Sequence, residues 1–436
     1  MNYRLGIDLG TSYFKLGLFD PDLHLRGIGR VEVPVRSGDN RAEVAVDAFW
    51  QTLRQGLEQA LEGACARVDE ISALSWSSQA NSYVLLDGAA NPLTPLILWT
   101  DTRAPEVPDV VRGLADRPDF VATTGLGCGL GRHAAVSKLV WMQRHDPALW
   151  RRTVRVLTIS DYLSFALTGR FQGDAGTASL LGLLDQRALA WWPDAVTACG
   201  LSLAQLATPL RPGTVVGGCT EAGGSLLGLP SGARVSAGTL DHHAAALGAG
   251  LGACAPVSES TGTVLACVGL SDDYRPRAGV CHLPGTEPNA YALLVFDGNG
   301  AGVLEWYRRA YAPELTFQEL DRLAAAVPPD CDGLTARPQA HLQPGLAGFD
   351  NRQPDHGHGH YARAIMTASA DTLGLLLDRL CPEGRPGRVV ATGGGAHSPF
   401  WLQLKRERLG IDIVAAACRE PACRGAALLA ARGDPA

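Results

Sequence analysis

The sequence has few lysines and no long apolar or basic runs, and these shortages exclude several classes of protein. Only Lys15, Lys138 and Lys405 are lysines among 38 Lys and Arg residues, a bias that we attribute to genome composition rather than to function. No stretch approaches the roughly 18 apolar residues of a membrane-spanning helix, so we expect no membrane partner. The 44 Asp and Glu residues outnumber the cations, and the net charge is −6. This balance argues against a nucleic-acid partner.

Paired cysteines are missing as well. The eleven cysteines are scattered from Cys65 to Cys423 without any CxxC spacing, which predicts neither a disulfide framework nor a structural zinc site. The opening residues MNYRLGIDLG lack the basic flank and apolar run of a secretory signal. We therefore expect a cytoplasmic protein whose cysteines are small buried residues.

The length and composition nevertheless predict a folded chain. With 436 residues, of which 46% are hydrophobic, about two to three domains are expected. Arg4 to Leu9 and Tyr13 to Phe19 flank Gly10-Thr11-Ser12, which predicts a β-hairpin. Apolar spacing predicts further strands at 71–76 and 83–86, and helices at 44–63, 134–168 and 186–206. The mixture predicts an α/β fold with antiparallel hairpins.

A second hairpin is predicted near the middle of the chain. Val257 to Ser260 runs into Thr261-Gly262-Thr263, and the apolar run Val264 to Val268 follows. This order repeats that of the first hairpin. It indicates a duplicated architecture with a boundary between 245 and 256.

Residues 330–360 are rich in Pro, Gly, His and Asp and are predicted to form a surface loop. His356, His358 and His360 offer a metal site as the alternative. The loop is favoured because no acidic or cysteine partners accompany them at ligand spacing.

Asp8 stands at the end of the first strand, just before Gly10-Thr11-Ser12. Backbone N–H groups of such a turn can hold phosphate oxygens, and glycine permits a close approach. A carboxylate beside phosphates needs a cation between them, so Asp8 points to Mg²⁺. The alternative is an ordinary hairpin in which Asp8 caps the turn.

Asp241 lies between a glycine and a helical run of small residues. It could accept a proton from a hydroxyl nucleophile as a general base, or it could simply cap the helix. His242 and His243 follow it, and adjacent side chains on a helix point apart. We therefore expect at most one of these histidines to face a ligand.

Gly393, Gly394 and Gly395 follow an apolar strand predicted at 388–391 and precede a helical pattern. Three consecutive glycines predict close contact with a flat or charged ligand. The segment matches neither a Walker A loop nor the dinucleotide-binding GxGxxG pattern.

Two polar clusters, Ser77 to Asn81 and Trp99 to Arg103, come directly after apolar runs. Amide and carboxylate groups can bind hydroxyls while an aromatic ring covers C–H surface, a combination that suits polyhydroxy ligands. The alternative is a salt-bridged surface turn.

Together these segments resemble the FGGY family of carbohydrate kinases, within the actin, hexokinase and Hsp70 superfamily. The resemblance rests on GIDLGTSYFKLGLFD, AGTLDHHAAALGAG, STGTV and VVATGGGAHSPFWLQL, and it continues through SSQANSYVLLD, LILWTDTR, DGNGAGVLEWYRR and GAALLAA. It covers nearly the whole chain in order. It implies two actin-like (ribonuclease H-like) ATPase domains, 1–250 and 251–436, with a cleft between them. The sugar would be held mainly by the first domain and ATP mainly by the second.

The same resemblance implies roles for individual residues. Asp8 would organise Mg²⁺ and the phosphates, and Asp241 would take the proton from the sugar hydroxyl. The residues implied around the nucleotide are Gly10, Thr11, Ser12, Thr261, Gly262, Thr263, Gly393, Gly394 and Gly395. The residues implied at the sugar are Asn81, Trp99, Asp101, Arg103 and His242.

The sequence also departs from the family at the sugar side. Ala80-Asn81 stands where xylulose kinases usually carry Met-His, and His242-His243 stands where many members have Asn or small residues. We therefore expect ATP-dependent phosphorylation of a small ketose or polyol without naming the sugar, with a homodimer as the candidate assembly. The alternatives are a catalytically weak sugar sensor and a non-sugar ATPase of the actin or Hsp70 type.

Overall fold

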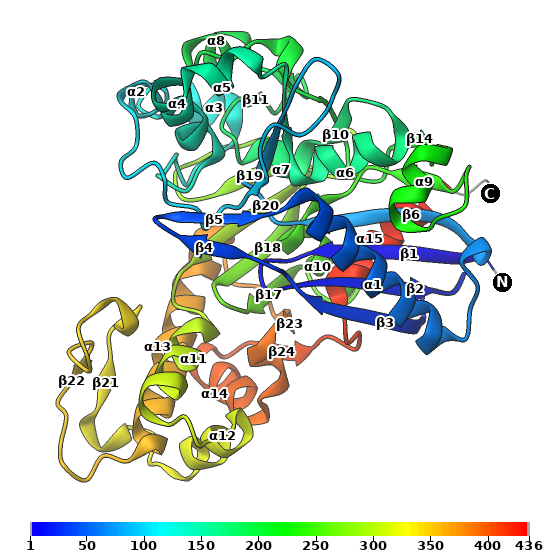
Figure 1. The fold of residues 1–436 in the computed structure, drawn as a ribbon. Coiled ribbons are helices and arrows are strands. Elements are labelled where there is room, and N and C mark those ends of the chain that lie inside the picture. Colours follow the sequence, from blue (N-terminus) through cyan, green and yellow to red (C-terminus); the bar gives the residue numbers. More distant parts are fainter. Residues whose placement is uncertain (1, 434–436) are drawn as a thin grey trace. The chain divides into compact units, whose positions relative to one another are not determined.

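The computed structural model describes residues 2–433 and divides the chain into two compact units. Unit 1 comprises residues 1–248, 271–292 and 420–436, and unit 2 comprises residues 249–270 and 293–419. The first break therefore lies close to the predicted boundary at residue 250. The segments 271–292 and 420–433, assigned to the second domain from the sequence, belong to unit 1. Figure 1 shows the elements of both units.

Unit 1 is built on a mixed sheet with the strand order β14-β15-β6-β1-β2-β3, and β16 pairs with β6 beyond this path. The strands are β1 (Tyr3–Leu9), β2 (Tyr13–Phe19), β3 (Leu25–Glu32), β6 (Ile71–Ser78), β14 (Val215–Gly218), β15 (Arg234–Ser236) and β16 (Thr239–Leu240). The hairpin predicted around residues 10–12 is confirmed: β1 and β2 are antiparallel, with Asp8 opposite Lys15.

Three strands of this sheet are parallel and end at the same edge. β1 runs parallel to β6 with Asp8 beside Ser77, and β16 runs parallel to β6 with Thr239 beside Ser77. The carboxyl ends of parallel strands are the usual place for ligands in α/β sheets. Asp8 and Asp241, which lie 233 positions apart in the sequence (241 − 8), therefore belong to one edge.

Two helices cover opposite faces of this sheet, α1 (Val46–Ala64) and α15 (Pro421–Ala431) (Figure 1). Glycines on the strands let both helices approach closely. A methyl group at Gly29 would lie 1.8 Å from the carbonyl oxygen of Gly56 on α1, and one at Gly6 would lie 2.0 Å from that of Cys423 on α15. The core between them is apolar, with Leu5, Ile7, Phe14, Phe49 and Trp76 buried.

The rest of unit 1 contains a second sheet with the order β4-β5-β8-β7-β9, two small two-stranded sheets and several short helices. The strands of these sheets are β4 (Arg36–Gly38), β5 (Arg41–Val44), β7 (Tyr83–Leu86), β8 (Leu96–Ile97), β9 (Arg155–Thr158), β10 (Gln172–Asp174), β11 (Leu184–Asp185), β12 (Ala190–Trp191) and β13 (Thr208–Leu210). The residues of unit 1 also include β19 (Cys281–Pro284), which belongs to none of these sheets. The helices are α2 (Asp109–Ala115), α3 (Phe120–Thr124), α4 (Ala135–His145), α5 (Pro147–Arg152), α6 (Ile159–Thr168), α7 (Ala175–Ser179), α8 (Pro193–Ala198), α9 (Glu221–Leu227) and α10 (Asp241–Ala249).

Two of the predicted helices differ in the structure. The pattern at 134–168 is interrupted by the strand β9, because β9 pairs with β7 and Thr158 then caps α6 by accepting the N–H of Asp161. The pattern at 186–206 contains the short helix α8 (Pro193–Ala198) and one turn of 3-10 helix (Leu203–Gln205) in place of a continuous helix. The apolar residues of 186–206 have helical spacing, but several of them lie in β12 and in irregular backbone instead.

Unit 2 repeats the arrangement of the first sheet. Its strands follow the order β20-β18-β17-β23-β24 within a six-stranded sheet whose edge strand is β19, with β17 antiparallel to β18 and parallel to β23. These strands are β17 (Val257–Thr261), β18 (Leu265–Ser271), β20 (Tyr291–Asp297), β23 (Arg388–Thr392) and β24 (Asp412–Ala415). The helices are α11 (Ala301–Tyr311), α12 (Phe317–Ala326), α13 (His358–Leu380) and α14 (Pro399–Leu409). The second hairpin and the duplicated architecture are thus confirmed.

The segment 330–360 consists mainly of turns around a small pair of strands, β21 (Thr335–Ala336) and β22 (Phe349–Asp350). The described histidines of this segment do not join a group of three potential metal ligands. Between residues 2 and 433, the one such group is Asp20, Asp22 and His24. There the Asp20 carboxylate accepts the backbone N–H groups of the other two residues and so closes a turn.

The cysteines only partly follow the prediction of burial. Six of the eleven are buried, but Cys65, Cys128 and Cys254 are exposed. Cys65, for example, ends α1 in the left-handed conformation with a φ of 50°. Every helix within residues 2–433 is too short or too polar to cross a lipid bilayer.

We expect Gly6→Ala to destabilise unit 1 because the added methyl group would collide with the backbone of α15 at Cys423. Overpacking of this kind lowers the free energy of unfolding by about 1–3 kcal/mol. Urea denaturation measures the change. Gly38→Ala is the matched control, since its methyl group would meet nothing within 4 Å. Equal stability of the two variants would contradict the packing of α15 against β1.

Candidate active site

Asp8 is a buried carboxylate at the end of β1, with 6% of its surface exposed. The Ser77 hydroxyl donates a hydrogen bond of 3.0 Å to its Oδ1, and Lys15 Nζ lies 3.6 Å from its Oδ2. The pKa of Asp8 is raised to about 6: burial is the largest cause, the carboxylates of Asp241 and Glu420 add to the rise, and Lys15 and Ser77 oppose it. A buried carboxylate with a raised pKa beside a second carboxylate is a typical feature of functional sites.

Lys15 was not among the residues selected from the sequence. It lies on β2 opposite Asp8, and its ammonium group also contacts the Glu420 carboxylate at 2.9 Å. Both acids raise the pKa of Lys15 against the opposing effect of burial. The lysine therefore stays charged and partly compensates the buried Asp8.

Asp241 is the first residue of α10 and follows β16 directly. Its Oδ1 accepts the backbone N–H of His242 at 2.7 Å, and its side chain is half-buried. The strand register brings this carboxylate to the edge that holds Asp8, and the effect of Asp241 on the pKa of Asp8 reflects this proximity.

The two histidines after Asp241 have different surroundings. His243 is buried, its Nδ1 lies 3.1 Å from the Thr239 hydroxyl, and burial lowers its pKa to about 4. His243 is therefore neutral and belongs to the packing of α10. His242 is only half-buried, so it is the histidine that could reach a ligand.

The turn after Asp8 is tight. A methyl group at Gly10 would lie 2.8 Å from the carbonyl oxygen of Tyr13, and the Gln79 amide donates to the Gly10 carbonyl at 3.2 Å. Ser12 is exposed, whereas the Thr11 hydroxyl accepts the indole N–H of Trp99 at 2.9 Å. The Gly10–Ser12 turn and Trp99 are thus in direct contact.

Asn81 and Trp99 lie on segments that Lys138 holds together. Lys138 is fully buried, and its Nζ donates to the carbonyl oxygens of Leu98 at 2.7 Å and of Asn81 at 3.1 Å. The Asn81 side chain accepts the N–H of Ala135, the first residue of α4, and so caps that helix. Burial lowers the pKa of Lys138 to about 7.

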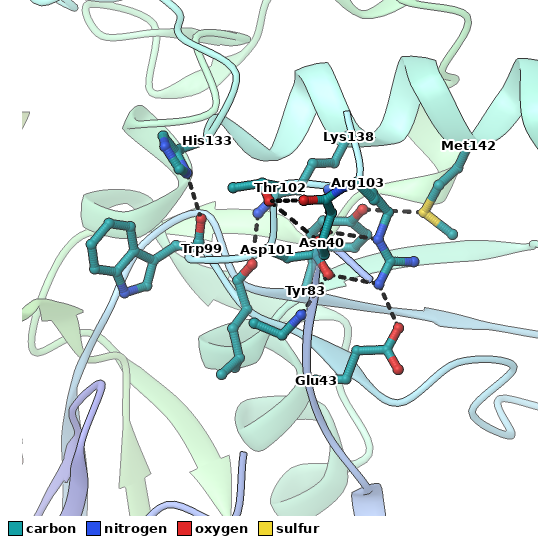
Figure 2. Close-up of polar contacts among 12 residues, drawn as sticks. Asn40, Glu43, Tyr83, Trp99, Asp101, Thr102, Arg103, His133, Lys138 and Met142 are labelled. Carbon is teal, nitrogen blue, oxygen red and sulfur yellow. Dashed lines mark hydrogen bonds and ion pairs between the residues drawn. The ribbon is translucent and has the colours of Figure 1, made fainter. Parts of the chain in front are cut away.

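Asp101 and Arg103 form an ion pair with each other, and Arg103 also contacts Glu43. Asp101 is fully buried, and its Oδ2 also accepts the N–H of Ala42 at 2.9 Å. Figure 2 shows the indole ring of Trp99 pointing away from this pair, with the Trp99 carbonyl oxygen hydrogen-bonded to the His133 ring. The cluster is brought together, but its charged members face one another. Their contact with a sugar stays a prediction.

In unit 2, the second hairpin turn (Thr261–Thr263) and the glycine turn (Gly393–Gly395) lie side by side. A methyl group at Gly393 would lie 2.7 Å from the Thr261 carbonyl oxygen, and one at Gly395 would lie 2.7 Å from Thr261 Cγ2. Gly393 has a φ of 77°, in the left-handed region that favours glycine. The close approach of the second hairpin turn therefore favours glycine at Gly393 and Gly395, independently of any contact with a ligand.

A buried ion pair supports these two turns. Lys405 Nζ lies 2.6 Å from Glu259 Oε1 and 2.7 Å from the Thr261 hydroxyl, and both charged side chains are fully buried. Neither Glu259 nor Lys405 was selected from the sequence.

All three lysines have structural roles, so genome composition alone does not explain where they lie. Lys15 contacts Asp8, Lys138 holds the Asn81 and Trp99 segments, and Lys405 supports the second hairpin turn. A compact ammonium group with three donors fits such enclosed sites, whereas a planar guanidinium needs more room. Because this chain uses arginine for nearly all of its cations, the three lysines were the sequence signal that could have identified these positions.

Family models match both parts of the chain. The N-terminal domain of the FGGY family of carbohydrate kinases matches residues 3–248, and the C-terminal domain matches residues 301–433. The chain belongs to the FGGY family of carbohydrate kinases. It is therefore an ATP-dependent phosphotransferase, and the family resemblance of its sequence is confirmed. Membership separates it from chaperone- and filament-type ATPases.

Individual relatives agree with this membership in the FGGY family. The chain is 26% identical over 457 residues to a xylulose kinase of Bacillus subtilis, with 100% of this chain and 89% of that protein covered. It is 27% identical to a probable L-xylulose kinase of Pasteurella multocida, with 99% and 91% covered. The crystal structure of a xylulose kinase from Rhodospirillum rubrum matches with a TM-score of 0.82 and 25% identity, covering 100% of this chain and 91% of that one.

A glycerol kinase from Plasmodium falciparum, solved with ADP, matches with a TM-score of 0.81 at 17% identity, covering 99% of this chain and 89% of that chain. At that identity the match concerns the fold alone. The α/β architecture is that of the actin-like ATPases, as the sequence predicted.

We expect Asp8→Asn to stabilise the protein at neutral pH in the absence of metal and nucleotide. Because the folded-state pKa of about 6 lies above the ordinary value of 3.8, the folded chain binds more protons, and stability falls as pH rises from about 4 to 6. Above that window the buried charge lowers the free energy of unfolding by its full amount, on the order of 3 kcal/mol. Asparagine carries no charge, so this loss is absent from the variant. Thermal unfolding in EDTA at pH 8 and pH 4 measures the difference, which should vanish at pH 4.

Asp350→Asn is the control for this experiment. Asp350 is paired with Arg337, which holds its pKa below the ordinary value, so its amide should not stabilise at either pH. A loss of stability in Asp8→Asn at pH 8 would contradict the assigned cost of the buried carboxylate.

Proposed function

We propose that this carbohydrate kinase transfers the γ-phosphoryl group of Mg-ATP to a hydroxyl of a small ketose or polyol, with Asp241 as the general base. The observation that carries the proposal is the pair of carboxylates, Asp8 and Asp241, at the carboxyl edge of β1, β6 and β16. Phosphoryl transfer depends mainly on positioning and charge neutralisation, and both are served by fixed groups at this edge.

Asp8 is the residue that would hold Mg²⁺. Its carboxylate is a hard oxygen ligand, and the cost of burying it would be offset by a divalent cation. Magnesium is commonly bound by one or two carboxylates together with substrate phosphates, and it would neutralise phosphate charge when bound. The donor set around Asp8 therefore fits this ion.

Asp241 would act on the sugar. Its carboxylate accepts the proton of the reacting hydroxyl while that oxygen bonds to the γ-phosphorus and the bond to the bridging oxygen of ADP breaks. The hydrogen bond from the His242 N–H to Oδ1 fixes the orientation of the carboxylate. Oδ2 has no role in that bond and is the oxygen that we assign to the proton.

The nucleotide would be held by backbone groups. The N–H groups of Gly10, Thr11 and Ser12 would bind phosphate oxygens, as would those of the second hairpin turn Thr261–Thr263. The glycine turn Gly393–Gly395 would contact the adenosine. Domain closure around both substrates would exclude water and suppress ATP hydrolysis.

The sugar would lie against Trp99, with His242 and the Asn81 segment as its other neighbours. Asp101 and Arg103 would shape the loop or contact hydroxyls. The relatives are named xylulose and L-xylulose kinases, so we place pentuloses first among the candidate acceptors.

Asp241→Asn should reduce kcat by about 10²–10⁴-fold, because removal of a positioned general base costs that much. ADP and sugar binding should persist, since the amide oxygen can still accept the His242 N–H. Coupled ADP-release kinetics and calorimetry measure the two effects. Asp109→Asn, a like change at the exposed first residue of α2, should retain full activity. Unchanged turnover in Asp241→Asn would refute the base assignment.

A substrate screen tests the function as a whole. With Mg-ATP present, we expect at least one pentulose, hexulose, heptulose, tetritol or glycerol to stimulate ADP release, and we expect a ketose to give the highest kcat/KM. Sugar binding without stimulated ADP release would instead favour the sugar sensor.

A further inference from the structure

We propose that Glu259, Thr261 and Lys405 form a buried positioning triad that holds the second hairpin turn against the glycine turn and thereby sets the affinity for the nucleotide. The inference rests on the proposed function, which assigns both turns to ATP. It concerns three side chains that do not touch the nucleotide themselves, so each acts as a positioning group.

The three side chains form a closed ring of hydrogen bonds. Lys405 donates to Glu259 Oε1 at 2.6 Å and to the Thr261 hydroxyl at 2.7 Å. That hydroxyl in turn donates to Glu259 Oε2 at 2.7 Å. Both carboxylate oxygens and the hydroxyl are thus satisfied, and the Thr261 hydroxyl is not available to a phosphate.

The ring is isolated from solvent. Glu259, Thr261 and Lys405 all have 0% of their surface exposed. Lys405 also lies over the ring of Trp401, with Nζ 5.6 Å from the ring centre. A buried ion pair of this kind contributes little net stability compared with apolar residues of the same size. The geometry that the pair fixes therefore accounts for it better than net stability does.

Thr261 transmits that geometry to the glycine turn. Its Cγ2 and its carbonyl oxygen are the atoms nearest to the positions that methyl groups on Gly395 and Gly393 would take. The Thr392 hydroxyl, immediately before the glycine turn, donates to the Glu259 carbonyl at 3.0 Å. Residues 259–261 therefore contact the glycine turn itself and also Thr392, the residue that precedes it.

The strand register explains why one residue can hold both turns. β17 and β23 are parallel, with Ser260 beside Thr392, so the turns that follow them leave the sheet at the same edge. Lys405 reaches this edge from α14, the helix that follows the glycine turn. A displacement of the Thr261 side chain would therefore move the two turns relative to each other.

Thr261→Val tests the triad because valine keeps the branched shape and the Cγ2 contact but loses the hydroxyl. Losing a hydrogen bond to charged groups should weaken ADP binding and raise the KM for ATP by about tenfold or more. The KM for the sugar should change by less than about twofold, because uniform binding of only one substrate is affected. Thr261→Ser restores the hydroxyl and should recover most of the ADP affinity.

Calorimetric binding of ADP in the presence of Mg²⁺ is the primary measurement, since it does not depend on turnover. Thr316→Val is the control: Thr316 caps α12 in the same unit, so this change should lower the melting temperature without weakening ADP binding. Equal ADP affinity of Thr261→Val and the wild type would overturn the triad. Failure of the wild type to bind ADP would instead refute the proposed function.

A double variant separates positioning from simple stability. Lys405→Met alone leaves the Glu259 carboxylate buried without its partner and should lower the melting temperature strongly. Glu259→Leu combined with Lys405→Leu should recover much of that temperature. If the triad positions the turns, ADP affinity stays low in the double variant. Recovery of both stability and affinity would show a purely structural role and overturn the proposal.

Discussion

The burial of Asp8 at an edge shared by three parallel strands is the constraint on which the rest of unit 1 depends. The carboxylate is held where its charge is costly, since burial raises its pKa to about 6. The surrounding groups reduce that cost without removing it: Ser77 donates a hydrogen bond, and Lys15 supplies a charge shared with Glu420. A buried carboxylate whose charge is only partly compensated is suited to bind a cation that enters the site together with the substrate.

The same edge determines where the other groups lie. β16 ends beside β6, so α10 begins with Asp241 close to Asp8. The turn after β1 reaches Trp99 through the Thr11 hydroxyl. The Gly10–Ser12 turn, Asp241 and Trp99 are thus connected by strand register and one hydrogen bond. Under the proposed function, a sugar bound at Trp99 would lie beside this turn.

Unit 2 repeats this design with different chemistry. Again a hairpin is extended by a parallel strand, and again an acid on the first hairpin strand meets a lysine. In unit 1 the acid is Asp8, and its carboxylate stays at the site. In unit 2 the acid is Glu259, and Lys405 together with Thr261 encloses it completely. One pair is suited to bind a cation, and the other is suited to hold the backbone of a turn.

The sequence by itself determined the two hairpins and the family, but not the helices predicted at 134–168 and 186–206. The alternation of apolar residues around Gly10-Thr11-Ser12 and Thr261-Gly262-Thr263 defined both hairpins, and the ordered motifs identified a carbohydrate kinase, because hairpins and glycine turns depend on neighbouring residues. The tertiary structure decided which distant residues meet. Nothing local links Glu420 to Lys15, or Lys405 to Glu259, since these ion pairs span 405 and 146 positions (420 − 15 and 405 − 259). Only the packing of strands and helices brings such charges together.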